Sequence, residues 1–274
     1  MTIAYFPGCT LSTKAAGYDR SGRAVAQALG MPLAELPEWQ CCGATFPLAT
    51  DNSMALVAPT RLLVQGAASG GHVTTLCAVC FHVLRRTQNF LGNHPDVLER
   101  INWFTEEPYD GNTRVSHFLE LLRDELTWEE LAKRVTHPLK NLRVAPYYGC
   151  LLLRPQAEIG LDDSDAPTLL HDCLAALGCQ VVDFPYQTEC CGSFLAASRP
   201  ELQAEFGQKL AHDILASARR HGAQALATAC PLCQFNLDYP QRVEGAQEVA
   251  PMAAGSSEAL PVLYFTQLMS VALG

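Results

Sequence analysis

Short apolar runs alternate with longer amphipathic segments along the whole chain. In the first half the strand-like runs are residues 3–6, 33–36 and 72–76, and the helical segments are residues 18–29, 53–68 and the stretch after Cys80. Gly30 is placed to end the first helical segment, and Pro59 should bend or restart the second. Strands that alternate with helices predict parallel βαβ units.

The second half repeats this order. Its strand-like runs are residues 143–148, 180–184 and 225–229, and its helical segments are residues 167–177 and 200–220. The last segment is the most regular, because it carries an apolar stripe at i, i+4 spacing formed by Leu202, Phe206, Leu210 and Ile214. Ser198 and Pro200 supply helix start signals.

A less regular segment joins the two halves. Residues 94–111 are irregular and rich in Pro, Asp and Gly, and helices are expected near residues 115–126 and 128–135. We therefore expect three parts: a first repeat over residues 1–92, a bridging helical segment over 93–142, and a second repeat over 143–274 that ends in a strand and a helix. Residues 241–260 are low in bulky apolar side chains, and we expect a mobile loop there.

Three landmarks recur in the same order in both halves. The segment 4–9 resembles 145–150, each half then has a Cys-Cys-Gly, and each half reaches a Cys-x-x-Cys. The first-half cysteines are Cys9, Cys41, Cys42, Cys77 and Cys80, and the second-half cysteines are Cys150, Cys190, Cys191, Cys230 and Cys233. The chain therefore predicts an α/β fold of two tandem, pseudo-symmetric repeats with parallel sheets.

These cysteines closely follow predicted strands. Their thiols should gather at the carboxyl ends of the strands, where open α/β folds bind ligands. A Cys-x-x-Cys that opens a helix brings two sulfurs to one metal centre, and Gly43 and Gly192 can adopt φ > 0 and direct N–H groups at sulfur. Tetrahedral zinc and cubane [4Fe–4S] clusters use four protein ligands, so five thiols in each half favour an unusual iron–sulfur centre. Structural zinc and a disulfide framework are the competing interpretations.

Composition narrows the possibilities further. With 49% apolar and 17% charged residues the chain can form a sizeable hydrophobic core, so its 12 cysteines are not needed as stabilising cross-links. The start of the chain lacks the features of an export signal, and no apolar run approaches a membrane span, so we expect a cytoplasmic protein without a direct span. A formal charge of −9 argues against nucleic acid, and no Gly-x-Gly-x-x-Gly follows a strand, so flavin or nicotinamide must belong to a partner.

Two further cysteines have no first-half counterpart. Cys173 lies on an apolar helical stripe, and Cys179 begins a strand-like segment. We interpret both as core residues rather than ligands.

The two Cys-Cys-Gly repeats resemble the cysteine-rich CCG domains of the B subunit of heterodisulfide reductase, over almost the whole chain. The segments 149–155, 230–234 and 261–269 are also similar to that protein. The resemblance implies two noncubane [4Fe–4S] clusters that face one another across a substrate cleft, each held by the five cysteines of one half. The gaps of 34 and 38 residues between Cys-Cys and Cys-x-x-Cys depart slightly from the usual family spacing, which concerns loop geometry more than ligation.

The same resemblance implies partners and a reaction. The related protein works in an electron-bifurcating complex, together with a flavin-containing A subunit plus an iron–sulfur C subunit, and reduces or forms a small-molecule disulfide with paired one-electron centres. The alternative is a non-catalytic electron-relay or docking subunit of a dehydrogenase complex, because CCG-type domains also serve complexes without disulfide chemistry.

Two side chains other than cysteine are candidates for the site. Arg154, four residues after Cys150, could bind a carboxylate, sulfonate or phosphate of the substrate, and an exposed arginine without such a role is the alternative. His82, just past Cys80, could donate a proton to a leaving thiolate, and a surface or hydrogen-bonded histidine is the alternative.

Overall fold

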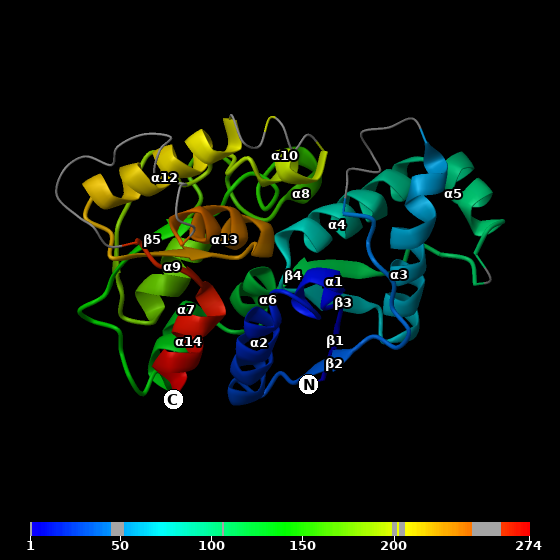
Figure 1. Ribbon diagram of the computed structural model, residues 1–274. Helices are drawn as coiled ribbons and strands as arrows, with labels where there is room; N and C mark the ends of the chain where they lie inside the picture. Colours follow the sequence, from blue (N-terminus) through cyan, green and yellow to red (C-terminus); the bar gives the residue numbers. More distant parts are fainter. Residues whose placement is uncertain (1, 45–51, 106, 199–201, 203–205, 243–258) are drawn as a thin grey trace. The chain divides into compact units, whose positions relative to one another are not determined.

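The computed structural model describes residues 2–44, 52–105, 107–198, 202, 206–242 and 259–274 (Figure 1). The chain divides into two compact units. The first comprises Met1–Thr127 and Arg154–Leu161, and the second comprises Trp128–Leu153 and Asp162–Gly274. The second half of the sequence therefore contributes one short segment to the first unit.

The first unit follows the predicted order of strands and helices through residue 93, but Pro95–Asn102, in the segment expected to be irregular, forms a helix. Its elements are β1 (Ile3–Tyr5), α1 (Gly8–Leu11), α2 (Ala16–Ala28), β2 (Leu33–Glu35), the 3-10 helix η2 (Ser53–Leu56), α3 (Val57–Ala68), β3 (His72–Thr75), α4 (Ala78–Asn93), α5 (Pro95–Asn102), β4 (Arg114–His117), α6 (Phe118–Glu125) and, from the later segment, α8 (Gln156–Ile159). The helix restart expected near Pro59 occurs at Val57, where η2 passes into α3.

The second unit repeats that order. Its elements are α7 (Trp128–Arg134), β5 (Arg143–Tyr147), α9 (Leu169–Ala176), β6 (Gln180–Val181), α10 (Ser193–Ser198), α12 (Gln208–Arg220), β7 (Ala225–Thr228), α13 (Pro231–Asp238), the 3-10 helix η4 (Tyr239–Gln241), β8 (Val262–Tyr264) and α14 (Phe265–Leu273).

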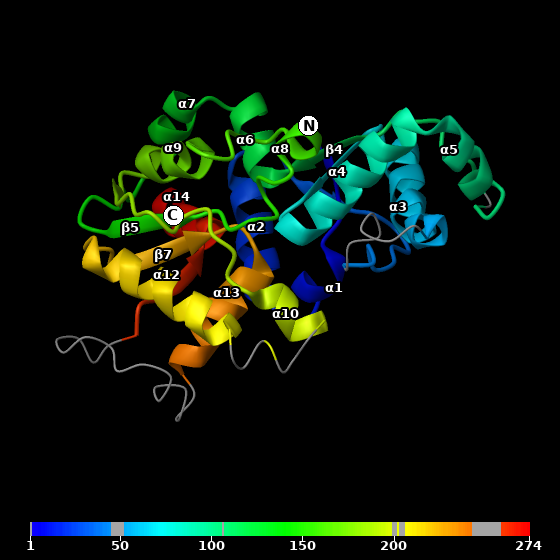
Figure 2. The ribbon, with the colours of Figure 1, turned by 90° about the horizontal axis from the view of Figure 1, so that it is seen from above.

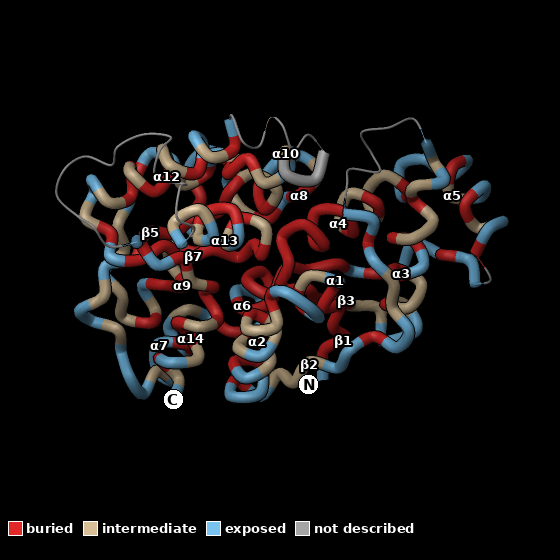
Figure 3. Tube along the Cα trace, in the orientation of Figure 1, coloured by how far each residue is buried: buried red, intermediate tan, exposed pale blue. Residues whose placement is uncertain are grey.

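Each unit contains a four-stranded, all-parallel sheet; parallel sheets were predicted, but the fourth strand of the first unit was not. The strand orders are β2-β1-β3-β4 and β6-β5-β7-β8, which are the same order twice. The central strands β1, β3, β5 and β7 are largely buried, whereas the edge strand β2 is partly exposed (Figure 3). The α/β fold and the duplication are therefore confirmed.

One expected helix is in part a strand. The sequence predicts helix over residues 115–126, but Arg114–His117 forms β4 and the helix α6 begins only at Phe118. The His117 side chain accepts a hydrogen bond from the Leu119 N–H and so fixes the start of α6. The second unit has the same strand-to-helix step at Tyr264 and Phe265, between β8 and α14.

The helix expected over residues 200–220 also differs. In the described residues α12 spans Gln208–Arg220, and residues 199–201 and 203–205 lie outside the description. The buried face passes through Ala211, Ile214, Leu215 and Ala218, whereas Phe206 and Leu210 are 48% and 39% exposed. Of the predicted stripe, Ile214 is buried and Leu202 is half-buried, whereas Phe206 and Leu210 lie outside the buried face of α12. The expected loop at 241–260 lies mostly outside the described residues, at 243–258.

Packing under the first sheet sets the position of Cys77. The Tyr18 hydroxyl on α2 donates to the Leu76 carbonyl at 2.7 Å, and His117 Nε2 donates to the same oxygen at 2.9 Å. Helix α2 approaches closely because Gly22 has no side chain, and a Cβ there would lie 2.3 Å from a Leu76 methyl carbon. Helices α3 and α4 pack beside one another on the sheet (Figure 1, Figure 2). The residue before Cys77 is thus held from two sides.

The segment from Arg154 to Leu161 is bound to α4 and α6 of the first unit. Arg86 Nε on α4 pairs with the Glu158 carboxylate at 2.7 Å, and Asn89 Nδ2 donates to the Glu158 carbonyl at 2.5 Å. Arg123 Nη1 donates to the Leu161 carbonyl at 2.9 Å. Residues that follow Cys150 by only a few positions are therefore part of the first unit.

No helix in the described residues combines the length and apolar character that a bilayer crossing requires.

Candidate metal centres

The five first-half cysteines predicted as ligands come together in the first unit. Cys9 follows β1, Cys41 and Cys42 follow β2, and Cys77 follows β3 as the N-cap of α4, which carries Cys80 in its first turn. The Cys9 and Cys41 sulfurs are 3.9 Å apart and the Cys42 and Cys80 sulfurs 3.6 Å apart. The Cys77 thiol interacts with Cys80. The strands thus deliver all five thiols to one edge of the sheet.

The second unit gathers its own five thiols in the same way. Cys230 is the N-cap of α13, as Cys77 is of α4. The Cys191 and Cys233 sulfurs are 3.5 Å apart, and the thiols of Cys150 and Cys190 interact, as do those of Cys230 and Cys233. The Gly192 N–H lies 3.4 Å from the Cys190 sulfur. Each unit therefore contains five clustered thiols of its own.

Glycines make room for these sulfurs. Gly43 and Gly192 have φ of +93° and +80°, as the sequence predicts. The sequence analysis missed Gly8 and Gly149, which also have positive φ, of +73° and +66°. A Cβ would lie 2.7 Å from the Cys80 sulfur at Gly8 and 3.2 Å from the Cys233 sulfur at Gly149. The repeated Gly-Cys at positions 8–9 and 149–150 was the available signal.

The thiols share protons within each set. Hydrogen bonds from Cys41 and Cys80 lower the pKa of the Cys42 thiol to about 4, and a hydrogen bond from Cys150 lowers the pKa of Cys190 to about 6. The hydrogen bond that Cys80 donates to Cys42 raises the pKa of the Cys80 thiol well above its ordinary value. A hydrogen bond with Cys77 and the burial of Cys80 act in the same direction. Each set can therefore carry thiolate charge that bound metal cations would neutralise.

The donor set fits an iron–sulfur cluster better than one metal ion. Among the described residues, no three His, Cys, Asp or Glu side chains converge as they would around a single ion. The sulfurs instead contact one another in succession, as Cys77, Cys80 and Cys42 do, and thiols are the ligands that iron–sulfur clusters use. Thiolate ligands distributed over several irons are the usual support of iron–sulfur clusters, and the space at Gly8 and Gly149 keeps the backbone clear of the sulfurs.

A family model described as the CCG cysteine-rich domain matches residues 3–85 and 144–238. The chain belongs to this CCG family. The matched ranges contain all ten clustered cysteines, so the two sites are the two copies of the CCG domain.

Curated relatives are subunits of reductases. A protein named 8-methylmenaquinol:fumarate reductase membrane anchor subunit, from Wolinella succinogenes, is 37% identical over 275 residues, which cover 99% of this chain and 92% of that protein. The B subunit of the ferredoxin/F420H2-dependent CoB-CoM heterodisulfide reductase of Methanosarcina acetivorans is 29% identical over 276 residues, covering 99% and 89%. The resemblance to the heterodisulfide reductase B subunit is confirmed, and a role in iron–sulfur electron transfer is supported.

A solved structure confirms the fold. The crystal structure of a hypothetical protein from Helicobacter pylori matches with a TM-score of 0.75 and 13% identity. The match covers 100% of this chain but 49% of that one, so this chain spans about half of that protein.

His82 lies inside the first CCG unit, buried and two residues beyond Cys80. Its Nε2 is 3.3 Å from Arg86 Nη1, and because arginine can only donate, Nε2 accepts. A proton on the neutral ring is then carried by Nδ1. Its role as a proton donor stays a prediction.

Arg154 is exposed and begins the segment that belongs to the first unit, whereas Cys150 belongs to the second. It follows Cys150 along the chain but packs with the other CCG unit. Its role in substrate binding stays a prediction.

The two extra cysteines lie apart from the clustered thiols. Cys173 is fully buried on α9, with its sulfur 3.9 Å from that of Met269, so the core interpretation is confirmed. Cys179 is half-buried, and burial raises the pKa of its thiol to about 11.

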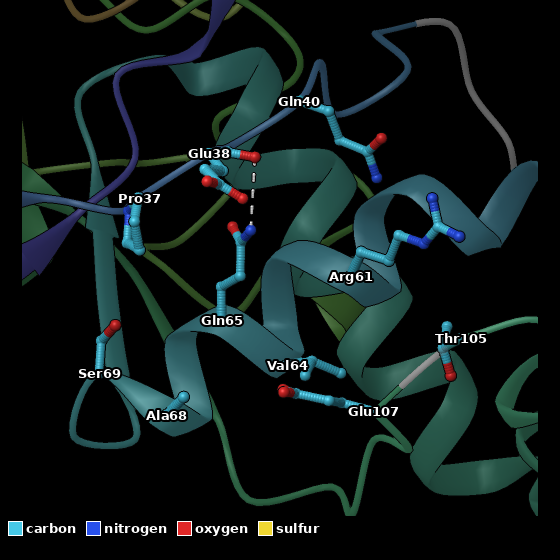
Figure 4. A pocket seen from close by; sticks show the side chains of 10 residues that line it. All are labelled: Pro37, Glu38, Gln40, Arg61, Val64, Gln65, Ala68, Ser69, Thr105 and Glu107. Carbon is cyan, nitrogen blue, oxygen red and sulfur yellow. Dashed lines mark hydrogen bonds between the residues drawn. The ribbon is translucent and has the colours of Figure 1, made fainter.

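A pocket of about 490 Å³ lies beside the loop that precedes Cys41 (Figure 4). Pro37, Glu38 and Gln40 line it from the loop, and Arg61 and Gln65 line it from α3, where Gln65 Nε2 donates to the Glu38 carbonyl at 3.5 Å. Its described lining includes no cysteine and carries charges of both signs. It is therefore separate from the thiol set.

Proposed function

We propose that this chain is the iron–sulfur subunit of a multi-subunit reductase and that each CCG unit holds one noncubane [4Fe–4S] cluster. The observation that carries the proposal is the gathering of five thiols, rather than four, in both units. Cys9, Cys41, Cys42, Cys77 and Cys80 would hold the first cluster, and Cys150, Cys190, Cys191, Cys230 and Cys233 the second. When bound, such clusters take up and release single electrons.

The chain's own groups serve that role in three ways. The thiolates anchor the irons, the first-turn N–H groups of α4 and α13 stabilise negative charge, and the positive-φ glycines keep the backbone off the sulfurs. The Leu76 carbonyl, held by Tyr18 and His117, fixes the approach of Cys77. These contacts support rigid cluster sites, which electron transfer favours.

The reaction we propose is reduction, or formation in the reverse direction, of a small-molecule disulfide. A disulfide takes up two electrons and two protons to become two thiols, and two one-electron centres in one chain match that demand. The heterodisulfide reductase B subunits among the relatives support this assignment. In this proposal Arg154 binds an anionic group of the substrate and His82 supplies a proton.

A relay between a quinol and a dehydrogenase partner is the second candidate. The specific observation in its favour is the 37% identity with the 8-methylmenaquinol:fumarate reductase membrane anchor subunit, over 99% of this chain. In such a role the two centres would pass electrons between partners without binding a disulfide.

Under either proposal electrons arrive through other subunits. We propose that the direct partner is a C-like iron–sulfur subunit, that a flavin-containing A-like subunit lies beyond it, that the complex bifurcates electrons, and that its location is cytoplasmic. The relatives named as subunits of larger reductases support such partners.

One assay separates the two reactions. The purified complex is reduced with viologen dye and offered small disulfides carrying carboxylate, sulfonate or phosphate groups, or a menaquinone analogue. Disulfide-dependent oxidation of the dye, with an altered iron EPR signal when the product thiol is added, would support the reductase. Quinone-dependent turnover without response to disulfide or thiol would support the relay.

Replacing Arg154 by Ala should raise KM for an anionic disulfide by about 10- to 150-fold while leaving iron content unchanged, because a charge-assisted hydrogen bond of about 1.5–3 kcal/mol would be lost. Steady-state kinetics and an iron assay on the same preparation measure both quantities. Arg100, an exposed arginine of α5 paired with Asp96, is the matched control. An unchanged KM would remove Arg154 from substrate binding.

A further inference from the structure

The loop that carries the second Cys-Cys-Gly is held by hydrogen bonds from the end of β5 and from α13. The Tyr147 hydroxyl donates to the Glu189 carbonyl at 2.7 Å, one residue before Cys190. The N–H groups of Tyr148 and Gly149 both donate to the Gln187 carbonyl, at 2.9 Å and 3.2 Å. Residues at the end of β5 thus restrain Gln187 and Glu189, which precede the cysteine pair, through hydrogen bonds.

A second restraint comes from α13. The side-chain amide of Asn236, one turn after Cys233, donates to the Cys191 carbonyl. Asn236 is 4% exposed and its bond to Cys191 is buried, so water competes little for it, whereas the bond from the buried Tyr147 hydroxyl ends on the carbonyl of the exposed Glu189 and is partly buried. The second cysteine pair is therefore fixed on both sides.

The equivalent positions of the first unit lack the groups that make three of these four bonds. Phe6-Pro7-Gly8-Cys9 corresponds to Tyr147-Tyr148-Gly149-Cys150, and Val83 stands three residues after Cys80 as Asn236 stands three after Cys233. The correspondence also holds in space, because Phe6 and Cys80 flank Gly8 as Tyr147 and Cys233 flank Gly149. Phenylalanine has no hydroxyl, proline no N–H and valine no amide, so these three bonds cannot form.

The first loop is held by other contacts. Trp39 packs edge-on against Phe6 with ring centroids 5.5 Å apart, and its indole N–H donates to Glu35 at 2.8 Å. Neither contact reaches a backbone group of the cysteine pair. Correspondingly, Cys9 and Cys41 are exposed, whereas Cys150 and Cys190 are half-buried.

We propose that the two metal sites are unequal: the first is the one that outside molecules reach, and Tyr147 and Asn236 are positioning residues that keep the second closed. The inference rests on the proposed cluster binding. The first site then exchanges electrons with a redox partner or substrate, and the second stores or relays electrons behind a fixed loop. A loop opens less often when additional hydrogen bonds hold it, and Tyr147 and Asn236 supply such bonds to the second loop.

Iron release from the loaded chain tests the difference between the sites. Under anaerobic conditions a ferrous chelator should remove iron from the wild-type chain in two phases, and Cys41→Ser should abolish the fast phase. In the Cys41→Ser background, the double variant Tyr147→Phe, Asn236→Val should speed the remaining phase at least tenfold, since each lost bond is worth about a factor of five in the opening equilibrium. Loss of the fast phase in Cys190→Ser instead would overturn the proposal.

The cluster-free chain gives a second measurement that needs no iron. Mass spectrometry follows maleimide addition to Cys190, and the double variant should raise that rate at least tenfold. Because the rate at the same thiol is compared between variants, differences in intrinsic reactivity between cysteines do not affect the comparison. Tyr148→Phe is the matched control: it removes a neighbouring buried hydroxyl that bonds Pro167, Leu170 and His171, and it should leave the Cys190 rate unchanged.

The outcomes separate this inference from the proposed function. A chain that binds no iron while Cys190 still responds to the double variant would refute the cluster assignment and keep Tyr147 and Asn236 as restraints on the loop. A chain that binds iron but shows the same Cys190 rate and the same release kinetics in the double variant would refute the inequality alone. Thermal unfolding of each variant shows whether faster addition reflects local opening or global unfolding.

Discussion

A Cys41→Ser chain should hold about four irons and as many acid-labile sulfides, where the wild-type chain should hold about eight of each. The physical reason is that each unit contributes its complete set of five thiols, so the loss of one ligand damages one cluster. Cys190→Ser should likewise remove about half of the iron, from the other unit. Colorimetric iron and sulfide assays on anaerobically purified protein measure both, and the EPR spectrum of each variant should retain one cluster signal.

Cys173→Ser provides the control for this experiment. Like Cys190→Ser it removes a thiol from the second unit, but this thiol is buried and contacts Met269 rather than the clustered sulfurs. Its iron content should remain at the wild-type value while the melting temperature falls. If Cys41→Ser kept full iron and an unchanged spectrum, Cys41 would be a spare thiol and a four-cysteine cubane would replace the noncubane assignment. About two zinc ions and no sulfide in the wild-type chain would reject iron–sulfur altogether.

Gly8→Ala should abolish the first cluster and lower the stability of the chain. The backbone at Gly8 has φ of +73°, which costs an alanine about 1–2 kcal/mol. The added Cβ would also stand 2.7 Å from the buried Cys80 sulfur, and overpacking of this kind costs about 1–3 kcal/mol more. Iron should therefore fall towards half, and the denaturation midpoint should fall with it.

The matched substitution at Gly149 should be milder. Its Cβ would stand 3.2 Å from the Cys233 sulfur, so a small shift can relieve the contact, and only part of the second cluster should be lost. Gly17→Ala is the control, since Gly17 lies in α2 with no heavy atom within 4 Å of the added carbon and alanine favours helix. Full iron in Gly8→Ala would show that the chain places the first cluster elsewhere.

The sequence predicted the parts of the fold that repeat. Strands such as β3 and β7 are short and end two residues before Cys77 or Cys230, so their type, direction and candidate ligands followed from a local pattern seen twice. The strand β4 was missed because its four residues run directly into α6, whose apolar spacing continues the helical pattern backwards. Only pairing with β3, a long-range contact, distinguishes it.

Other features depend on contacts that no local pattern reveals. In the sequence Phe6 and Tyr147 look interchangeable, because each is an aromatic residue two positions before a Gly-Cys. Their difference appears only once the Glu189 carbonyl is found beside the Tyr147 hydroxyl. The i, i+4 spacing put Leu210 on the same face as Ile214, but Leu210 is exposed, because the buried face of α12 runs through Ala211, Ile214, Leu215 and Ala218.

The placement of α8 limits how this gene could be divided. A fragment that ends before β5 would keep Cys9 to Cys80 but lose Glu158 and the backbone acceptors at 158 and 161, leaving Arg86, Asn89 and Arg123 without these partners. The segment Arg154–Leu161 comes from the second half of the sequence but belongs to the first unit. If the gene were split into two single-repeat genes, the product of the first gene would keep these contacts only if it included the segment that contains α8.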